Sequence, residues 1–162
     1  MDAAEQLLAI EQIKQLKARY FRSMDTKDWD GFAAVFAPDA VLDVTGETGA
    51  DEGIVRGNEL IAAYVRGHVD PVTTVHHGHM PEIEVTSATT ASGVWSMEDM
   101  LRWPEGSPIA SMHGYGHYHE TYEKIGGNWL IKTLRLTRLH IEETRKNHPP
   151  RLSTDELDTF PR

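Results

Sequence analysis

The chain divides into a first part with helical periodicity and a second part with strand periodicity. Residues 4–25 predict a long amphipathic helix, because apolar side chains recur there every three or four positions, at Ile10, Ile13, Leu16, Tyr20 and Met24. A shorter helix is predicted over 28–37, where aromatic residues share one side and Pro38 ends the run. A third helix is predicted over 58–67, ending at a glycine.

From Val72 onward the apolar positions alternate, which is typical of strands. The four predicted strands, separated by turn residues, cover 74–86, 91–103, 109–125 and 128–142. A further strand is predicted over 40–44, followed by a loop over 45–57 that is rich in glycine and acids and could serve as a lid. Helices first and antiparallel strands last indicate an α+β fold, in which a curved sheet wraps around the helices.

Composition narrows the class of protein. The 162 residues are enough for one domain, expected over 1–146, with a polar tail over 147–162 that either covers a pocket mouth or is disordered. The chain has no run of about 18 apolar residues and no signal-like start, so we expect a cytoplasmic protein that does not bind membranes. A net charge of −9 argues against nucleic acid as a partner and favours a neutral or weakly acidic organic ligand.

Asp25 is the first candidate for chemistry. It lies one turn beyond Phe21, at the edge of the apolar stripe, where an ionised carboxylate is costly unless a polar partner meets it. One interpretation is that this carboxylate turns into solvent or caps the helix that follows. The other is that it lies inside a pocket and orients a base.

Histidines are the candidates for that base. The chain has nine, and six of them form two groups, His76-His77-Gly78-His79 and His113 with His117 and His119. A neutral imidazole oriented by a carboxylate can accept a proton near physiological pH. Alternatively, His77, His79 and Glu84 could bind a metal as in a cupin, although cupins are all-β and this chain begins with helices. A third possibility is that most of these histidines lie on the surface or at a subunit contact.

The sequence resembles the SnoaL-like group of the nuclear-transport-factor-2-like superfamily over about residues 8–140. The resemblance rests on the helix with Tyr20 and Asp25 and on the run Asp-Trp-x-x-Phe-x-x-x-Phe-x-x-Asp-Ala-Val at 28–41. It extends through the strand that contains His76 and the final hairpin at 122–129. The resemblance implies a cone-shaped α+β fold with an internal pocket.

The resemblance also implies roles for individual residues. His76 would abstract a proton and Asp25 would orient it, while Tyr20 would help to hold or polarise the substrate. On the strand near 112–122, Gly116 and Tyr118 would face the pocket together with Gly114, the glycines leaving room for a ligand.

Two features of relatives are harder to place. A second histidine would fall near Met100 or Leu101, neither of which can replace it. A basic residue of the last strand would fall near Leu134 or Arg135, so Arg135 is a candidate substrate-binding residue.

Together these features predict a dehydratase-like lyase without a metal or organic cofactor. Its substrate would be a small hydrophobic molecule of cyclic, polyketide, steroid or aromatic type. An isomerase of the same fold and a protein that only binds such a molecule are the alternatives. We also expect a homodimer or homotrimer, because the outer face of the sheet is predicted to carry Met97, Leu101, Trp103 or their neighbours.

Overall fold

A computed structural model describes residues 1–49 and 53–146. The helices are α1 (Ala3–Asp25), α2 (Trp29–Ala33), α3 (Thr45–Thr48) and α4 (Asn58–Val69). The strands are β1 (Phe36–Asp43), β2 (Ile54–Arg56), β3 (Thr73–Val85), β4 (Thr90–Arg102), β5 (Ile109–Ile125) and β6 (Asn128–Arg145). The tail predicted over 147–162 lies outside the described residues.

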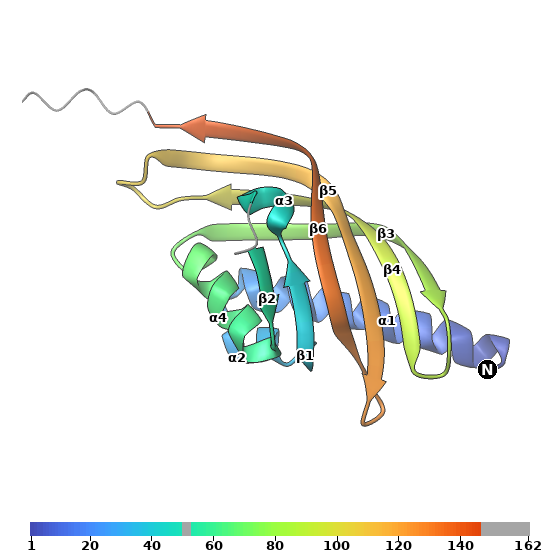
Figure 1. Ribbon diagram of the computed structural model, residues 1–162. Coiled ribbons are helices and arrows are strands. Elements are labelled where there is room, and N and C mark those ends of the chain that lie inside the picture. Colours follow the sequence, from blue (N-terminus) through green and yellow to red (C-terminus); the bar gives the residue numbers. More distant parts are fainter. Residues whose placement is uncertain (50–52, 147–162) are drawn as a thin grey trace, which may run out of the picture.

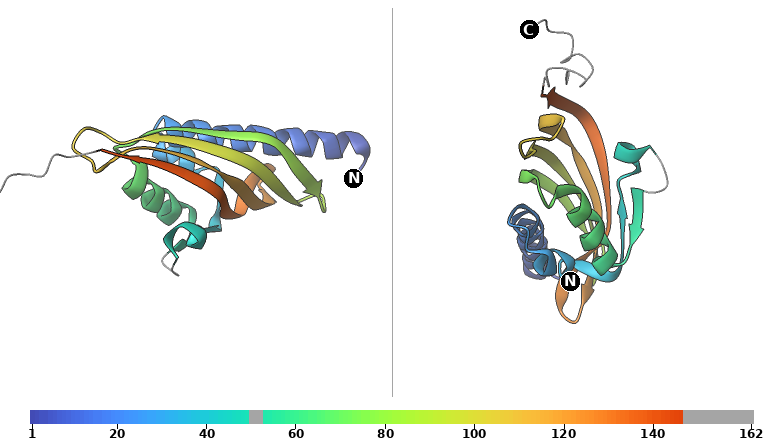
Figure 2. Two further views of the ribbon diagram at one scale, coloured as in Figure 1. Left: turned by 90° about the horizontal axis from the view of Figure 1, so that it is seen from above. Right: turned by 90° about the vertical axis from the view of Figure 1, so that its left-hand side faces the viewer.

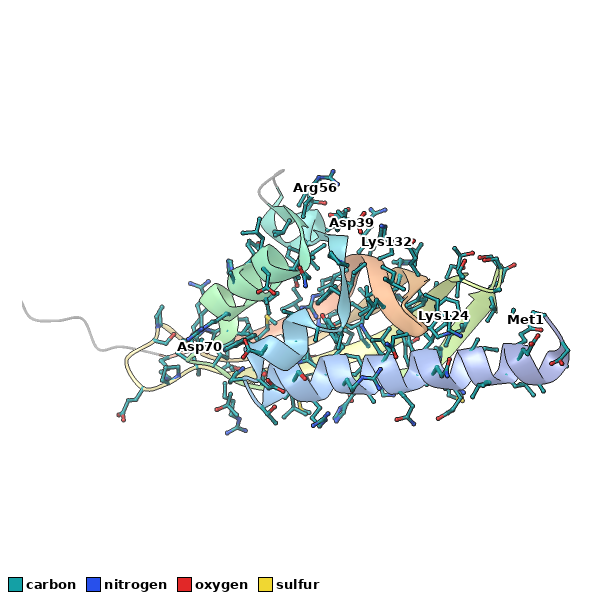
Figure 3. The ribbon with its side chains drawn as sticks, turned by 90° about the horizontal axis from the view of Figure 1, so that it is seen from below. Met1, Asp39, Arg56, Asp70, Lys124 and Lys132 are labelled. Carbon is teal, nitrogen blue, oxygen red and sulfur yellow. The ribbon has the colours of Figure 1, made fainter. Side chains whose placement is uncertain are left out.

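The six strands form one sheet in the order β2-β1-β6-β5-β4-β3. Only β1 and β6 pair in parallel, and a bond from Lys132 to Asp39 at 2.6 and 2.7 Å links these two strands (Figure 3). The sheet is strongly curved and does not close, and α1 runs along its inner side (Figures 1 and 2). The predicted α+β fold, a curved sheet wrapped around N-terminal helices, is therefore confirmed.

The helix α1 follows the predicted pattern. It begins with a capping box in which Asp2 and Glu5 bond each other's backbone N–H groups, and its apolar stripe, from Ala9 to Met24, is buried against the sheet. The opposite side of the helix is exposed and mostly polar, with Leu7 and Leu8 as apolar residues near its start. Across residues 1–49 and 53–146, no helix combines the length and the apolar character that crossing a bilayer would demand.

The region between α1 and α4 differs from the prediction. The second helix ends at Ala33 and a strand begins already at Phe36, because this segment pairs with β6 from Phe36 onward. The predicted loop over 45–57 contains the short helix α3 and the strand β2. Pairing and packing between distant segments decide these boundaries, and local patterns do not report them.

The structure decides which residues of β4 lie on its inner face and which on its outer face. Met97 and Leu101 point inward and are buried, at 3% and 7% exposure, so they are not outer-face residues. The outer face instead carries the cross-strand neighbours Val75 and Met100, each about 40% exposed. Self-association through this face stays a prediction.

Two bulges interrupt β6. Neighbouring residues of β5 pair with Ile131 and Thr133, and further along with Arg138 and His140, so Lys132 and Leu139 are extra residues. The second bulge brings the backbone of β6 close to Gly116, where a Cβ atom would lie 2.0 Å from the Thr137 carbonyl oxygen. The expectation that Gly116 leaves room for a ligand is therefore wrong, because the neighbouring backbone takes that space.

A buried ion pair joins α1 to β5. The ammonium of Lys17 contacts the carboxylate of Glu120, and both side chains are at most 1% exposed. Glu120 also accepts a bond from the Tyr122 hydroxyl, which in turn accepts one from Trp95 Nε1 at 2.8 Å. Burial lowers the pKa of Lys17 to about 8, although Glu120 acts in the opposite direction.

Replacing Gly116 tests the close approach at the second bulge. We expect Gly116→Ala to lower the free energy of unfolding by about 1–3 kcal/mol, because the methyl group meets backbone that cannot move without breaking the sheet. Gly67→Ala is the matched control, since no atom lies within 4 Å of the added Cβ in helix α4, and it should be neutral or stabilising by about 0.5–1 kcal/mol. Urea denaturation measures both, and equal effects would contradict the assignment.

Removing one charge of the buried pair should cost more than removing both. Lys17→Met leaves the Glu120 carboxylate buried and unpaired, and we expect a loss of about 3–5 kcal/mol in the free energy of unfolding. The double variant Lys17→Met with Glu120→Gln should recover most of that loss, because no uncompensated charge remains. Additive losses in urea denaturation would show that the pair is not coupled.

Candidate functional site

Asp25 lies at the end of α1 and is turned toward the start of β3. The chain leaves the helix through Lys27, whose backbone has a positive φ of 62°, and Lys27 Nζ donates to Thr74 Oγ1 at 3.0 Å. Asp25 Oδ1 accepts from Thr74 Oγ1 and Oδ2 accepts from the backbone N–H of His76, each at 2.9 Å. The carboxylate is thus fixed by β3, and the alternative that it turns into solvent is wrong.

His76 is paired with that carboxylate. Its Nδ1 lies 2.6 Å from Asp25 Oδ1, and only 6% of the side chain is exposed. Because an ionised carboxylate can only accept, Nδ1 carries the proton and Nε2 is left with its lone pair. The ring of Phe21 is nearly parallel to the imidazole, at 6.5 Å between centroids and 12° between planes.

Hydrogen bonding sets the charge of Asp25. Burial alone would raise the pKa of its carboxyl group, but the bonds from the side chain and backbone of His76 and from Thr74 lower the pKa below its usual value. Asp25 is therefore ionised at neutral pH. An ionised carboxylate fixes the tautomer of His76, because it accepts the hydrogen bond from Nδ1.

A second carboxylate, that of Asp99, faces the other side of His76. Asp99 is the direct cross-strand neighbour of His76 on β4, is 3% exposed, and places Oδ2 4.0 Å from Nε2. The sequence contained a signal for it, since Asp99 is an acid within the column of alternating apolar residues Trp95, Met97 and Leu101. The resemblance placed the second histidine of relatives near Met100 or Leu101, close to this position, and gave no role to Asp99.

Arg138 holds Asp99. Its Nη1 and Nη2 donate to the two carboxylate oxygens at 2.9 and 2.7 Å. Its Nε donates to Glu47 Oε1 of α3 at 2.7 Å, and Nη2 lies 2.6 Å from the same oxygen. Burial would lower the pKa of the guanidinium, but the carboxylates of Asp99 and Glu47 raise it above its usual value. The group is therefore a fixed cation at this site.

Arg135 is not part of this site. Its side chain is 65% exposed on the outer face and its Nε lies 3.8 Å from Asp43 Oδ2. The predicted basic residue of the last strand is instead matched in the interior by Arg138. The bulge at Lys132 shifts the alternation of β6 by one residue, which the sequence pattern could not reveal.

The space next to Gly114 is occupied by the ion pair of Asp99 and Arg138 and is not free for a ligand. A Cβ atom at this position would lie 2.4 Å from Asp99 Oδ1 and 2.5 Å from Arg138 Nη1. The two glycines of β5 that predicted space for a ligand thus accommodate protein atoms. The space next to Gly114 is filled by the ion pair that faces His76.

Tyr20 and Tyr118 lie together in the interior. Their exposures are 4% and 3%, their ring centroids are 5.9 Å apart, and Lys17 Nζ lies 3.8 Å from the centroid of each ring. Burial raises the pKa of both phenols, so both hydroxyls keep their protons. Lys17, which sequence reasoning did not assign, is the buried cation nearest to them in the described core.

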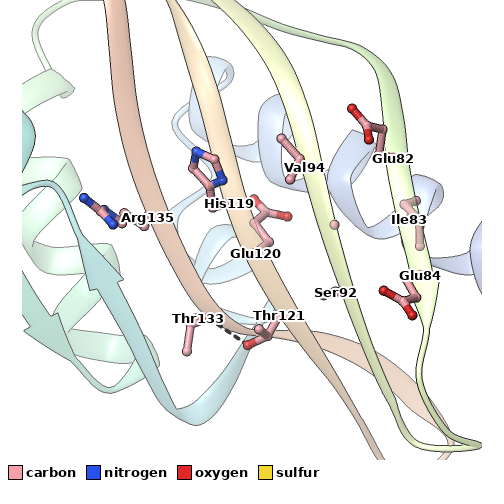
Figure 4. A pocket seen from close by; sticks show the side chains of 11 residues that line it. Glu82, Ile83, Glu84, Ser92, Val94, His119, Glu120, Thr121, Thr133 and Arg135 are labelled. Atoms are coloured by element: carbon pink, nitrogen blue, oxygen red, sulfur yellow. Dashed lines mark hydrogen bonds between the residues drawn. The ribbon is translucent and has the colours of Figure 1, made fainter.

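Two hollows of appreciable size lie away from His76. One, of about 610 Å³, crosses the outer face of the sheet and is lined by Glu82, Glu84, Val94, His119 and Arg135 with their neighbours (Figure 4). The other, of about 360 Å³, lies beside the start of α1 and includes Leu8 and Trp129. The hydrophobic pocket expected around His76 stays a prediction.

Three further histidines lie together on the outer face. His77, His79 and His113 each have a ring nitrogen 3.2 to 3.9 Å from an oxygen of Glu98. Glu84, which the metal alternative required, instead lines the outer hollow. Within residues 1–49 and 53–146, no group of three or more potential ligands has an arrangement that could hold a metal ion.

Comparison with known proteins gives the family. The model of the family described as SnoaL-like domain matches residues 5–135. A probable cyclase, FGR4, from Gibberella zeae is 25% identical over 136 residues, which cover 79% of this chain and 89% of that protein.

Solved structures share the fold. A hexachlorocyclohexane dehydrochlorinase, LinA type 2, has a TM-score of 0.77 at 20% identity, with 93% of this chain and 100% of that chain covered. A putative scytalone dehydratase from Novosphingobium aromaticivorans has a TM-score of 0.78 at 19% identity, with 94% and 99% covered. Because the family match spans most of the sequence and the fold agrees, this chain belongs to the SnoaL-like domain family of the nuclear-transport-factor-2-like superfamily.

Proposed function

We propose that this protein is a cofactor-free lyase or isomerase that removes a proton from a carbon atom of a small hydrophobic substrate. The observation that carries the proposal is the buried His76, whose Nδ1 is bonded to an ionised carboxylate and whose Nε2 is not. The dehydratase, dehydrochlorinase and cyclase among the similar proteins act in a class of chemistry that suits such a base. A protein that only binds a ligand has no need of this arrangement.

The proton would move as follows. Nε2 of His76 takes a proton from a carbon next to a carbonyl group, and the C–H electron pair forms an enolate on the substrate. In a lyase, the enolate re-forms the carbonyl and a C=C bond forms to the next carbon, while the hydroxyl group on that carbon takes the proton held by His76 and leaves as water. In an isomerase, His76 returns the proton to a different carbon. General base catalysis of this kind contributes about 10² to 10⁴-fold to the rate.

Asp25 and Asp99 would stabilise the imidazolium that forms. Asp25 accepts the hydrogen bond from Nδ1–H before and after the proton transfer. The new proton on Nε2 lies on the side of Asp99, whose Oδ2 is 4.0 Å from Nε2. A cation between two carboxylates is favoured by electrostatics, most of all where little water can screen the charges. Arg138 compensates the charge of Asp99, with Nη2 2.7 Å from Oδ2.

Tyr118 or Tyr20 would bond the oxygen that gains charge. Both phenols are buried and protonated, and a fixed donor in a dry site stabilises a developing oxyanion. Lys17 lies over both rings and contributes positive potential on the same side.

A turnover screen tests the proposed base. Hydroxylated cyclic ketones would be screened for loss of water through the absorbance of the conjugated product. For any substrate found, His76→Ala should lower turnover by about 10² to 10⁴-fold, and Asp25→Asn should also lower it, because the imidazole loses its orientation and charge stabilisation. His119→Ala, on the exposed outer face, is the matched control. Wild-type turnover in His76→Ala would reject the proposed role.

The charge of Asp25 also predicts how stability depends on pH. Since the pKa of Asp25 is lowered in the folded protein, the unfolded chain takes up this proton first as the pH falls. The contribution of ionised Asp25 to the free energy of unfolding is complete above the pKa of Asp25 in the unfolded chain, about 3.9. It is lost as the pH falls through the lower pKa of Asp25 in the folded protein. Asp25→Asn should therefore be less stable than wild type at pH 7, and the difference should shrink below about pH 4. Parallel curves of urea midpoint against pH would contradict this.

A further inference from the structure

Arg138 has one edge that faces out of the interior. At the end of its guanidinium, Nη1 and Nη2 each donate to one oxygen of Asp99, whose side chain is 4% exposed. The adjacent edge, Nε and Nη2, contacts α3 through Glu47, whose side chain is 32% exposed. The two carboxylates thus differ, because that of Asp99 is buried and that of Glu47 is partly exposed to solvent.

The contact of Arg138 with Glu47 uses one carboxylate oxygen, whereas its contact with Asp99 uses two. Both donors of the edge share the single oxygen Oε1, whereas a free carboxylate can give each donor its own oxygen in the parallel arrangement that arginine prefers. The helix that carries Glu47 has four residues and no side-chain cap at its start. Little local structure therefore opposes the exchange of Glu47 for another carboxylate.

Charge limits what can replace Glu47. If a neutral ligand displaced this carboxylate, the edge of a largely buried cation would lose its partner, which is costly. If an organic acid displaced it, the local charge would stay the same. A ligand bound at this edge would also lie close to the proposed base, because only the carboxylate of Asp99 separates Arg138 from His76.

We propose that the Nε and Nη2 edge of Arg138 is a carboxylate-binding site and that Glu47 is an internal occupant which the ligand displaces. The ligand is a small hydrophobic monocarboxylate. The proposal that a carboxylate binds at this edge is supported by the contacts of Arg138 alone. The further statement that this acid is the substrate rests on the proposed function of His76.

Benzoate serves as the probe, with binding measured by calorimetry at millimolar concentrations. Glu47→Gln should bind benzoate about tenfold more tightly than wild type, because the competing charge is gone and the edge is free in a larger share of molecules. Arg138→Lys keeps the positive charge but loses the paired donors, and it should lose most of the binding. Benzamide, a neutral ligand of the same shape, should bind neither protein.

Matched controls separate this site from general effects of charge. Glu59→Gln removes one exposed negative charge from α4, and Arg135→Gln removes an arginine that also faces a carboxylate but lies on the outer face. Neither should change benzoate binding. Melting temperatures of all variants show whether a loss of binding reflects unfolding, and inorganic phosphate tests whether any anion suffices.

The outcomes distinguish the two proposals. Tighter binding in Glu47→Gln with loss in Arg138→Lys supports the site, whether or not turnover is ever found. The site is overturned by equal affinity in Glu47→Gln and wild type, by binding of benzamide as tight as that of benzoate, or by loss of binding in Arg135→Gln. His76→Ala should keep benzoate binding, so a failure of the proposed catalysis would leave this result intact.

Discussion

The contact between the end of α1 and the start of β3 fixes the geometry of the interior. One carboxylate, that of Asp25, accepts from the backbone N–H and the ring of His76 and from Thr74. The same bonds that dock the helix on the sheet therefore also orient the imidazole. A site built on regular elements in this way is held more rigidly than one built on loops. The helix cannot shift along the sheet without also turning the ring.

The interior of the cone contains more charge than a simple hydrophobic pocket would. Lys17 with Glu120, and Arg138 with Asp99, form two pairs whose side chains are at most about one tenth exposed. Such pairs contribute little net stability because their desolvation is costly, but they specify which side chains must meet. Here they divide the inner face into a region around the two tyrosines and a region around His76.

Sequence reasoning predicted the elements with strong periodicity and the meeting of Asp25 with His76. The helix stripe and the alternating strands follow from local rules, and the two residues came from a resemblance that the fold supports. Asp99, Arg138 and Glu47 were not predicted. Their placement depends on strand register, on a bulge and on a four-residue helix, which are decided by contacts between distant segments.

The bulge at Lys132 has a consequence for how the strand can change. Before it, odd-numbered residues such as Trp129 and Ile131 face the core, and after it even-numbered residues such as Leu136 and Arg138 do. Losing this one extra residue would close the bulge and leave Leu136 and Arg138 facing inward, because the residues on either side of it would keep their partners on β5. A single-codon deletion there would therefore remove the bond from Lys132 to Asp39 and the local bend of the strand while keeping the chemistry of the chamber.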